Sequence, residues 1–318
     1  MPKKVRERSR AMRRAGRGVL STAVALAATV AVAGFAPASA QPAGILGAQT
    51  QTAHTAAGDV GYREVGTGSP ILLIAGRGAG MDSWAPSLVD ALAARHRVVV
   101  FDNAGIGETS ALPGPLTISA MAEQTSALIA TLRLHRPTVL GWSMGGMIAQ
   151  ALAVRHPAQV GRLVLAATQA GSGASLPIPP AAAAALDSPD LSVVMSVLFP
   201  ADQGAAARGY VAGILQYPHY YAASPAVKAE QDAAIGQWMA GQEPAGRELG
   251  RIHVPTLVAD GTQDALNPVA NDHLLRQDVR GAKLVLYPDA GHAFLFQDAA
   301  AFAPIVERFT HRESSDRG

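Results

Sequence analysis

The 318-residue chain carries 26 basic and 24 acidic residues, contains no cysteine and is 49% hydrophobic. The absence of cysteine excludes disulfide bonds, thiolate metal sites and a cysteine nucleophile. The charge is unevenly distributed. Residues 1–40 hold eight basic residues and one acidic residue, so the rest of the chain has 18 basic and 23 acidic residues. We therefore expect no nucleic-acid partner, because no excess of basic residues remains to attract phosphate groups.

Residues 1–40 have the three parts of an export signal. The basic residues all lie within 1–18, an uncharged stretch follows over 19–36, and the small-residue pattern Ala38-Ser39-Ala40 comes next. This order predicts cleavage after Ala40 and a protein that is secreted or held in the cell envelope. A retained membrane anchor is the alternative, because about 18 uncharged residues approach the length of a membrane span. The small residues of the stretch favour cleavage, after which we expect no stable span. Whether Arg13-Arg14 directs a twin-arginine or a general secretory route stays open.

The remaining chain alternates short apolar segments with segments of helical spacing. Continuously apolar runs such as Ile71–Ile74 are typical of strands that are covered on both faces. The sequence therefore predicts an α/β fold with a mostly parallel central sheet and helices on both faces. In such sheets the ligand site lies at the carboxyl ends of the strands. We predict strands at 59–64, 70–75, 97–101, 138–140, 161–167, 254–260 and 282–287, the first two forming a pair, and helices at 83–95, 118–134, 144–156, 268–277 and 297–312.

Residues 172–250 interrupt this alternation, because they contain no convincing strand. They begin with a proline-rich stretch at 177–180 and hold four of the six tyrosines. We predict a helical lid, inserted into a core made of residues 57–171 and 251–314, and a flexible tail at 41–56. The lid is apolar with some aromatic residues, so we expect a small, largely apolar substrate. The helical segments that we predict within it lie at 181–186, 191–198, 205–215 and 226–239.

The pattern Gly141-Trp142-Ser143-Met144-Gly145 lies between a predicted strand and a predicted helix. A serine on such a tight turn is held in a strained conformation with its hydroxyl clear of the sheet. The positions two before and two after the serine are crowded, and Gly141 and Gly145 fit there because they lack a Cβ atom. This context predicts that Ser143 is a nucleophile. The alternative is an ordinary serine in a glycine-rich turn.

A serine nucleophile needs a base, usually histidine, and a third group that orients the base. Of the nine histidines, His292 lies in the loop after the last predicted strand, at the edge of the sheet where Ser143 is expected. Asp264 follows the preceding strand, whereas Asp260 is expected within the strand itself. We therefore predict a triad in the chain order Ser143, Asp264, His292.

This order resembles the α/β-hydrolase superfamily, as do the motifs at 141–146, 260–264 and 291–294 and the loop at 101–110. The loop is similar to the family's D-x-x-G-x-G-x-S pattern, with Thr109 in place of the serine. The resemblance covers residues 55–312. It implies a serine hydrolase that cleaves a small carboxylic ester through an acyl-enzyme intermediate, with no cofactor and no metal. The backbone N–H groups of Met144 and Arg77 are the implied oxyanion donors.

The loop that carries Arg77 departs from the family pattern. Many members have His-Gly-x where this chain has Ala75-Gly76-Arg77, so the support of this loop is not evident from the sequence. We expect the Arg77 side chain to face solvent, with contact to an anionic substrate as the alternative.

Three other functions, two catalytic and one of ligand binding alone, fit the same motifs. Cofactor-free haloperoxidases, which are perhydrolases, use the same triad to make peracids, and some hydrolases of carbon–carbon bonds use a serine triad as well. A binding protein that keeps the fold without turning over its ligand is a third alternative, which an intact triad disfavours.

Overall fold

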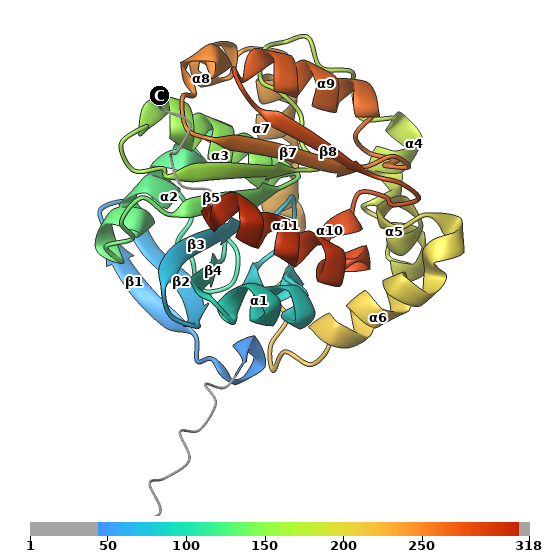
Figure 1. The fold of residues 1–318 in the computed structure, drawn as a ribbon, viewed down its shortest axis with the longest axis horizontal. Helices are drawn as coiled ribbons and strands as arrows, with labels where there is room; N and C mark the ends of the chain where they lie inside the picture. The colour runs from blue at the N-terminus through green and yellow to red at the C-terminus, as the bar shows by residue number, and fades with distance from the viewer. Residues whose placement is uncertain (1–43, 312–318) are drawn as a thin grey trace, which may run out of the picture. The chain divides into compact units, whose positions relative to one another are not determined.

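The structure is a computed structural model that describes residues 44–311. The predicted export signal and its cleavage site lie outside these residues. An eight-stranded sheet of order β1-β2-β4-β3-β5-β6-β7-β8 runs through the described chain (Figure 1). From β4 to β8 all neighbours are parallel, and β1 and β2 are antiparallel to their neighbours. The strands are β1 (Gln51–Thr55), β2 (Gly58–Val65), β3 (Ser69–Ile74), β4 (His96–Phe101), β5 (Thr138–Trp142), β6 (Arg162–Ala166), β7 (Thr256–Gly261) and β8 (Lys283–Tyr287).

Helices cover both faces of the sheet, so the predicted α/β fold is confirmed (Figure 1). The sheet separates two hydrophobic cores, and neighbouring residues of one strand enter opposite cores, as Leu72 and Leu73 do. This alternation explains why the central strands are apolar throughout. The core helices are α1 (Pro86–Ala93), α2 (Ile118–Thr131), α3 (Met144–Arg155), α9 (Val269–Asp278), α10 (Phe294–Gln297) and α11 (Ala299–His311), with short 3-10 turns η1 (Ile45–Gly47) and η2 (Met81–Ser83).

The N-terminal part of the described chain differs from the prediction in two respects. The expected flexible tail at 41–56 contains η1 and β1, and β1 forms a ladder with β2 from Gln51–Tyr62 to Thr55–Gly58. In addition, β2 and β3 do not pair with each other, because β4 lies between them. A two-glycine turn, Gly66 and Gly68, carries the chain past β4. A Cβ atom at Gly66 would lie 2.2 Å from the carbonyl oxygen of His96.

The segment between β6 and β7 is helical, as predicted for residues 172–250. An isolated antiparallel β-bridge joins Ala222 of this segment to Ala79. Glu243 anchors the segment to the core, because its carboxylate accepts hydrogen bonds from the backbone N–H groups of Ile118 (2.9 Å) and Ser119 (2.8 Å) at the start of α2. The elements are α4 (Pro180–Ala185), α5 (Leu191–Leu198), η3 (Ala201–Gln203), α6 (Gly204–Ile214), α7 (Pro225–Met239), α8 (Pro244–Arg247) and η4 (Leu249–Arg251).

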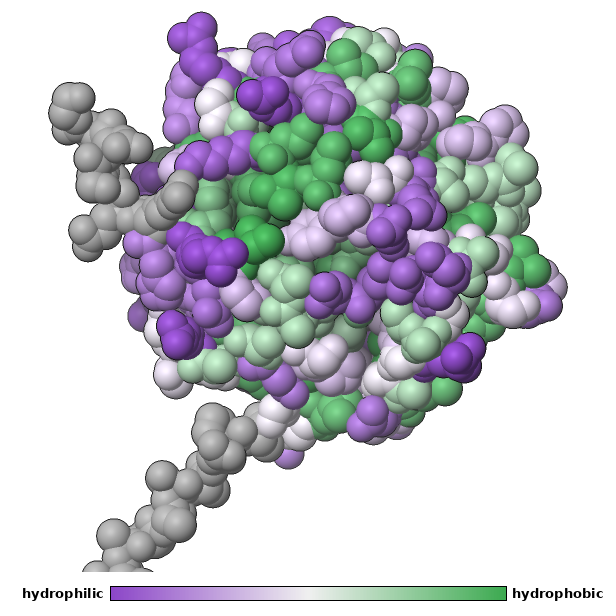
Figure 2. Space-filling model, turned by 45° about the vertical axis from the view of Figure 1, so that its right-hand side comes forward, coloured by the Kyte–Doolittle hydropathy of each residue, from purple (hydrophilic) through white to green (hydrophobic). Residues whose placement is uncertain are grey.

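This helical segment carries exposed large hydrophobic residues on its surface. All of the exposed large hydrophobic residues of the described chain belong to it: Leu176, Leu191, Val193, Leu215, Tyr220 and Tyr221. On the face turned forward in Figure 2, hydrophobic residues lie in patches between polar ones. Among residues 44–311, we find no helix with the length and hydropathy of a membrane span.

Candidate active site

Ser143 occupies the turn between β5 and α3 in a strained conformation, with φ 57° and ψ −124°. The turn is so tight that a Cβ atom at Gly141 would lie 2.2 Å from the carbonyl oxygen of Gly145. A Cβ atom at Gly145 would lie 2.0 Å from that of Ile74. The structure thus shows the crowding that the sequence pattern predicted. A strained serine at the carboxyl end of a central strand is the local geometry that a nucleophile requires.

His292 and Asp264 lie together, as predicted from their places after β8 and β7. His292 Nδ1 is 2.7 Å from Asp264 Oδ2, and the two side chains are 4% and 0% exposed. The other carboxylate oxygen of Asp264 accepts hydrogen bonds from the backbone N–H groups of Leu266 (2.7 Å) and Asn267 (2.8 Å). Asp264 is therefore fixed from both sides and orients the imidazole ring.

Ser143 and His292 line the same pocket, which encloses about 250 Å³. Within the part of the chain that the structure describes, no hydrogen bond joins the Ser143 hydroxyl to His292. Such contacts are often long in a free enzyme and shorten when substrate binds. The wall of the pocket combines core residues with residues of the helical segment: Arg77, Met144, Met147, Gln169, Ile178, Ala183, Ala184, Leu186, Asp187, Asp232, Ile235 and Leu266.

Two backbone N–H groups at this pocket are available as oxyanion donors. Met144 is the first residue of α3, so its N–H has no partner within the helix. Arg77 lies in the loop after β3, next to Gly76. A Cβ atom at Gly76 would lie 3.1 Å from the Ser143 Cβ. Neither N–H group donates a hydrogen bond to any of residues 44–311. Both predicted donors therefore belong to the pocket that contains Ser143.

The support of the oxyanion loop, which was not evident from the sequence, comes from two amide side chains. Asn103 Nδ2 donates a hydrogen bond to the Ala75 carbonyl at 3.0 Å. The buried Gln231 of α7 accepts one from the Gly78 N–H at 2.7 Å. Asn103 belongs to the 101–110 loop, so this loop helps to shape the site. These contacts replace the missing histidine of the His-Gly-x pattern.

The Arg77 side chain does not face solvent, contrary to our expectation. It is 11% exposed and binds the carboxylates of Asp187 and Asp232. Burial opposes its charge, but hydrogen bonds to Asp232 and Asp187 raise the pKa of Arg77 above its usual value. The same hydrogen bonds lower the pKa of Asp187. The ion pair therefore favours the charged forms of Arg77 and Asp187 at neutral pH.

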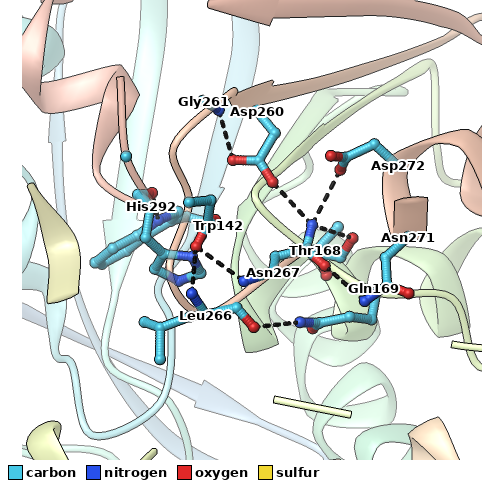
Figure 3. Close-up of polar contacts among 12 residues, drawn as sticks. Trp142, Thr168, Gln169, Asp260, Gly261, Leu266, Asn267, Asn271, Asp272 and His292 are labelled. Atoms are coloured by element: carbon cyan, nitrogen blue, oxygen red, sulfur yellow. Dashed lines mark hydrogen bonds and ion pairs between the residues drawn. The ribbon is translucent and has the colours of Figure 1, made fainter. Parts of the chain in front are cut away.

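A buried cluster of Asp260, Asn267 and Asp272 was missed by the sequence analysis (Figure 3). The Asn267 amide donates to Asp260 Oδ2 at 2.8 Å and to Asp272 Oδ1 at 3.0 Å. Burial and the nearby charge of Asp264 raise the pKa of Asp272 to about 8 and that of Asp260 far above its usual range. Burial therefore favours the protonated, uncharged form of both carboxyl groups at neutral pH.

Trp142 has a role that the elbow pattern did not indicate. Its ring nitrogen Nε1 donates a hydrogen bond to the carbonyl oxygen of His292 at 2.9 Å. Its ring lies against Phe296 with centroids 5.0 Å apart. The residue before Ser143 thus holds the loop that carries His292. Among the described residues, no group of three or more His, Asp or Glu side chains has the arrangement of a metal site.

A family model described as the α/β-hydrolase fold matches residues 69–299. The chain belongs to this family. It is 30% identical over 254 residues to a putative carbamate hydrolase, RutD, of Azorhizobium caulinodans, across 76% of this chain and 91% of that protein. It is 45% identical over 112 residues to a putative non-heme bromoperoxidase, BpoC, of Mycobacterium tuberculosis, across 35% of this chain and 42% of that protein.

A solved structure, an α/β-hydrolase fold protein from Chitinophaga pinensis, superposes with a TM-score of 0.73 at 22% identity. The match covers 84% of this chain and 99% of that one. At this identity the likeness shows the fold alone. With the family match and the hydrolase relative, the chain is a hydrolase of the α/β fold.

Proposed function

We propose that this hydrolase cleaves small carboxylic esters through an acyl-enzyme, with Ser143, His292 and Asp264 as its triad. One observation carries the proposal. The strained Ser143 and the His292–Asp264 pair meet at one pocket, whose wall also includes Arg77 and Met144. The pocket volume of about 250 Å³ lies below the usual range for drug-sized ligands, which supports a small acyl group.

In this mechanism His292 takes the proton of the Ser143 hydroxyl as the oxygen attacks the ester carbonyl. The Arg77 and Met144 N–H groups stabilise the oxyanion that forms. The alkoxide then leaves with the proton from His292, and the acyl group stays on Ser143. Water gives a proton to His292 and attacks the acyl-enzyme, which releases the carboxylic acid and restores the serine.

The test is hydrolysis of p-nitrophenyl esters from acetate to palmitate by the wild type and by Ser143→Ala. We expect activity that is highest on short chains and is lost in the variant. The same hydrolysis without Ser143, or a folded wild type that cleaves none of these esters, contradicts the proposal.

The match to a bromoperoxidase favours a second candidate reaction at the same site. Hydrogen peroxide would replace water in attack on the acyl-enzyme, giving a peracid and the free serine. Bromination in acetate buffer that requires both peroxide and Ser143 supports this candidate. Its absence, with ester hydrolysis intact, excludes it.

We propose that the helical segment at 172–250 acts as the lid of the site, which its contribution to the pocket wall supports.

We also propose that the protein is exported through the signal at 1–40, because the basic, uncharged and small-residue parts follow in the order of such signals. Intact mass of the protein recovered outside the cytoplasm tests export. We expect an N-terminus at Gln41.

A further inference from the structure

The Arg77 guanidinium is held by two carboxylates of the helical segment. Its Nε and Nη2 atoms donate to Asp232 at 2.5 and 2.6 Å, and its Nη1 and Nη2 atoms donate to Asp187 at 2.8 and 3.1 Å. Four of its five N–H groups are thereby used. Asp187 lies just after α4 and Asp232 lies in α7, so two separate parts of the segment meet on one residue of the oxyanion loop.

These three charged side chains line the pocket that contains Ser143. Together they contribute one positive and two negative charges to its wall. Lys228, whose charge also acts on Asp187, is not among the residues that line the pocket. His292 is the remaining titratable group of the wall. A ligand inside the pocket therefore meets an arginine that is already neutralised and an excess of carboxylate.

Because of this arrangement, a carboxylate on the substrate would find no unpaired arginine or lysine among the described residues that line the pocket. It would have to displace Asp187 or Asp232 from Arg77, or stay near both acids. Their side chains are 53% and 50% exposed, so solvent screens this repulsion in part but does not remove it. A neutral acyl chain meets neither cost. The cluster therefore distinguishes the two kinds of substrate by repulsion rather than by a new attraction.

We propose that the Asp187–Arg77–Asp232 cluster excludes substrates with a negatively charged acyl group and so restricts the enzyme to neutral esters. The inference rests on the proposed ester hydrolysis and adds the charge of the substrate to it. Asp187 and Asp232 are the residues that determine this specificity, and Arg77 positions them.

The test compares two esters of equal chain length, p-nitrophenyl hexanoate and mono-p-nitrophenyl adipate, which replaces the terminal methyl group by a carboxylate. The quantity measured is the ratio of kcat/KM for the adipate to kcat/KM for the hexanoate. We expect a wild-type ratio about tenfold or more below one, which corresponds to about 1.4 kcal/mol of discrimination. A wild-type ratio near one overturns the inference.

Two variants give opposite predictions. In Asp187→Asn/Asp232→Asn the guanidinium is freed, and the ratio should rise about tenfold or more. In Arg77→Met the two carboxylates remain without their cation, and the ratio should stay at or below the wild-type value. Both variants break the same contacts between loop and segment. If the cluster only holds the segment in place, the two variants change the ratio in the same direction or not at all, and that result contradicts the proposal.

Controls separate this inference from the proposed function. Glu123 binds Arg155 at 2.5 Å on the surface, outside the pocket wall, so Glu123→Gln removes a matched carboxylate and should keep the wild-type ratio. If the double variant does not fold, Asp187→Asn alone removes one charge at a half-exposed site, and the ratio should rise about threefold. An unchanged ratio in that variant contradicts the inference. If the folded wild type does not hydrolyse the hexanoate ester at all, that result contradicts the proposed function instead.

Discussion

Trp142 and His292 are 150 positions apart in the chain, yet the indole Nε1 of Trp142 donates a hydrogen bond to the His292 carbonyl at 2.9 Å. The bond links the residue before the proposed nucleophile to the backbone of the proposed base. The nucleophile turn and the loop of the base therefore hold a fixed spacing. Since Trp142 is 6% exposed, this bond is shielded from water.

Trp142→Phe should keep the aromatic packing and lose this hydrogen bond. A buried carbonyl left without its donor costs about 1–3 kcal/mol. We expect kcat/KM for p-nitrophenyl butyrate to fall about tenfold, because the imidazole loses its fixed position. Trp238→Phe is the matched control. Trp238 is buried and donates to the Gln169 carbonyl at 3.4 Å, so its hydrogen bond does not hold the backbone of His292. An equal loss of kcat/KM in both variants would assign the effect of Trp142 to stability alone.

Asp264→Asn should lower kcat by about 10³- to 10⁴-fold with little change in fold, because an amide does not hold the imidazole in the productive tautomer. Asp260→Asn provides the comparison, since Asp260 is buried at the end of β7 and bonds Asn267 rather than His292. Steady-state kinetics of both variants measures the difference. A larger loss of kcat in the Asp260 variant would mean that Asp264 is not the orienting acid.

The protonated state of Asp272 predicts how stability depends on pH. Its pKa is raised from 3.8 to about 8 by burial and by Asp264, so between these pH values the folded state keeps a proton that the unfolded chain has released. The stability that the folded state gains from holding Asp272 in its protonated form is complete below pH 3.8 and is lost as the pH rises towards 8. Asp272→Asn should reduce the decline of the unfolding free energy over pH 5–8 by about 1.4 kcal/mol per pH unit. Denaturant unfolding at several pH values measures it. Parallel pH curves for wild type and variant would contradict the protonated state.

The space around Gly145 predicts a severe effect for a single methyl group. In Gly145→Ala the new Cβ would lie 2.0 Å from the Ile74 carbonyl oxygen, so β3 and the nucleophile turn must move apart. We expect a loss of at least about 3 kcal/mol of unfolding free energy, together with the loss of activity. Gly236→Ala is the control, because nothing lies within 4 Å of its Cβ in α7. That substitution should stabilise the helix by about 0.5–1 kcal/mol. A mild effect at Gly145 would show that the turn is less tight than described.

The fold and the proposed catalytic residues could be predicted because they depend on local patterns. Buried strands, the glycine spacing around Ser143 and the position of His292 after the last strand are all visible in short segments. Asp264 was chosen over Asp260 by its distance from the strand end, and the structure bonds Asp264 to His292.

The contacts that escaped prediction join segments far apart in the chain. Arg77 binds Asp187 and Asp232, which lie 110 and 155 positions later in the sequence. No local pattern could therefore distinguish an arginine paired with two carboxylates from an exposed one. The strand β1 was missed for a similar reason. Its five residues, Gln51–Thr55, show the burial pattern of an edge strand with a single buried position, and only the ladder with β2 makes it a strand.

The central claim is that Ser143 is the nucleophile, activated by His292. The most direct measurement is labelling with diethyl p-nitrophenyl phosphate, followed by peptide mass spectrometry. We expect one diethylphosphoryl group per chain, on the peptide that contains Ser143, with labelling slowed in His292→Ala and absent in Ser143→Ala. A label on another residue, or a folded wild type that takes up none, would contradict the account.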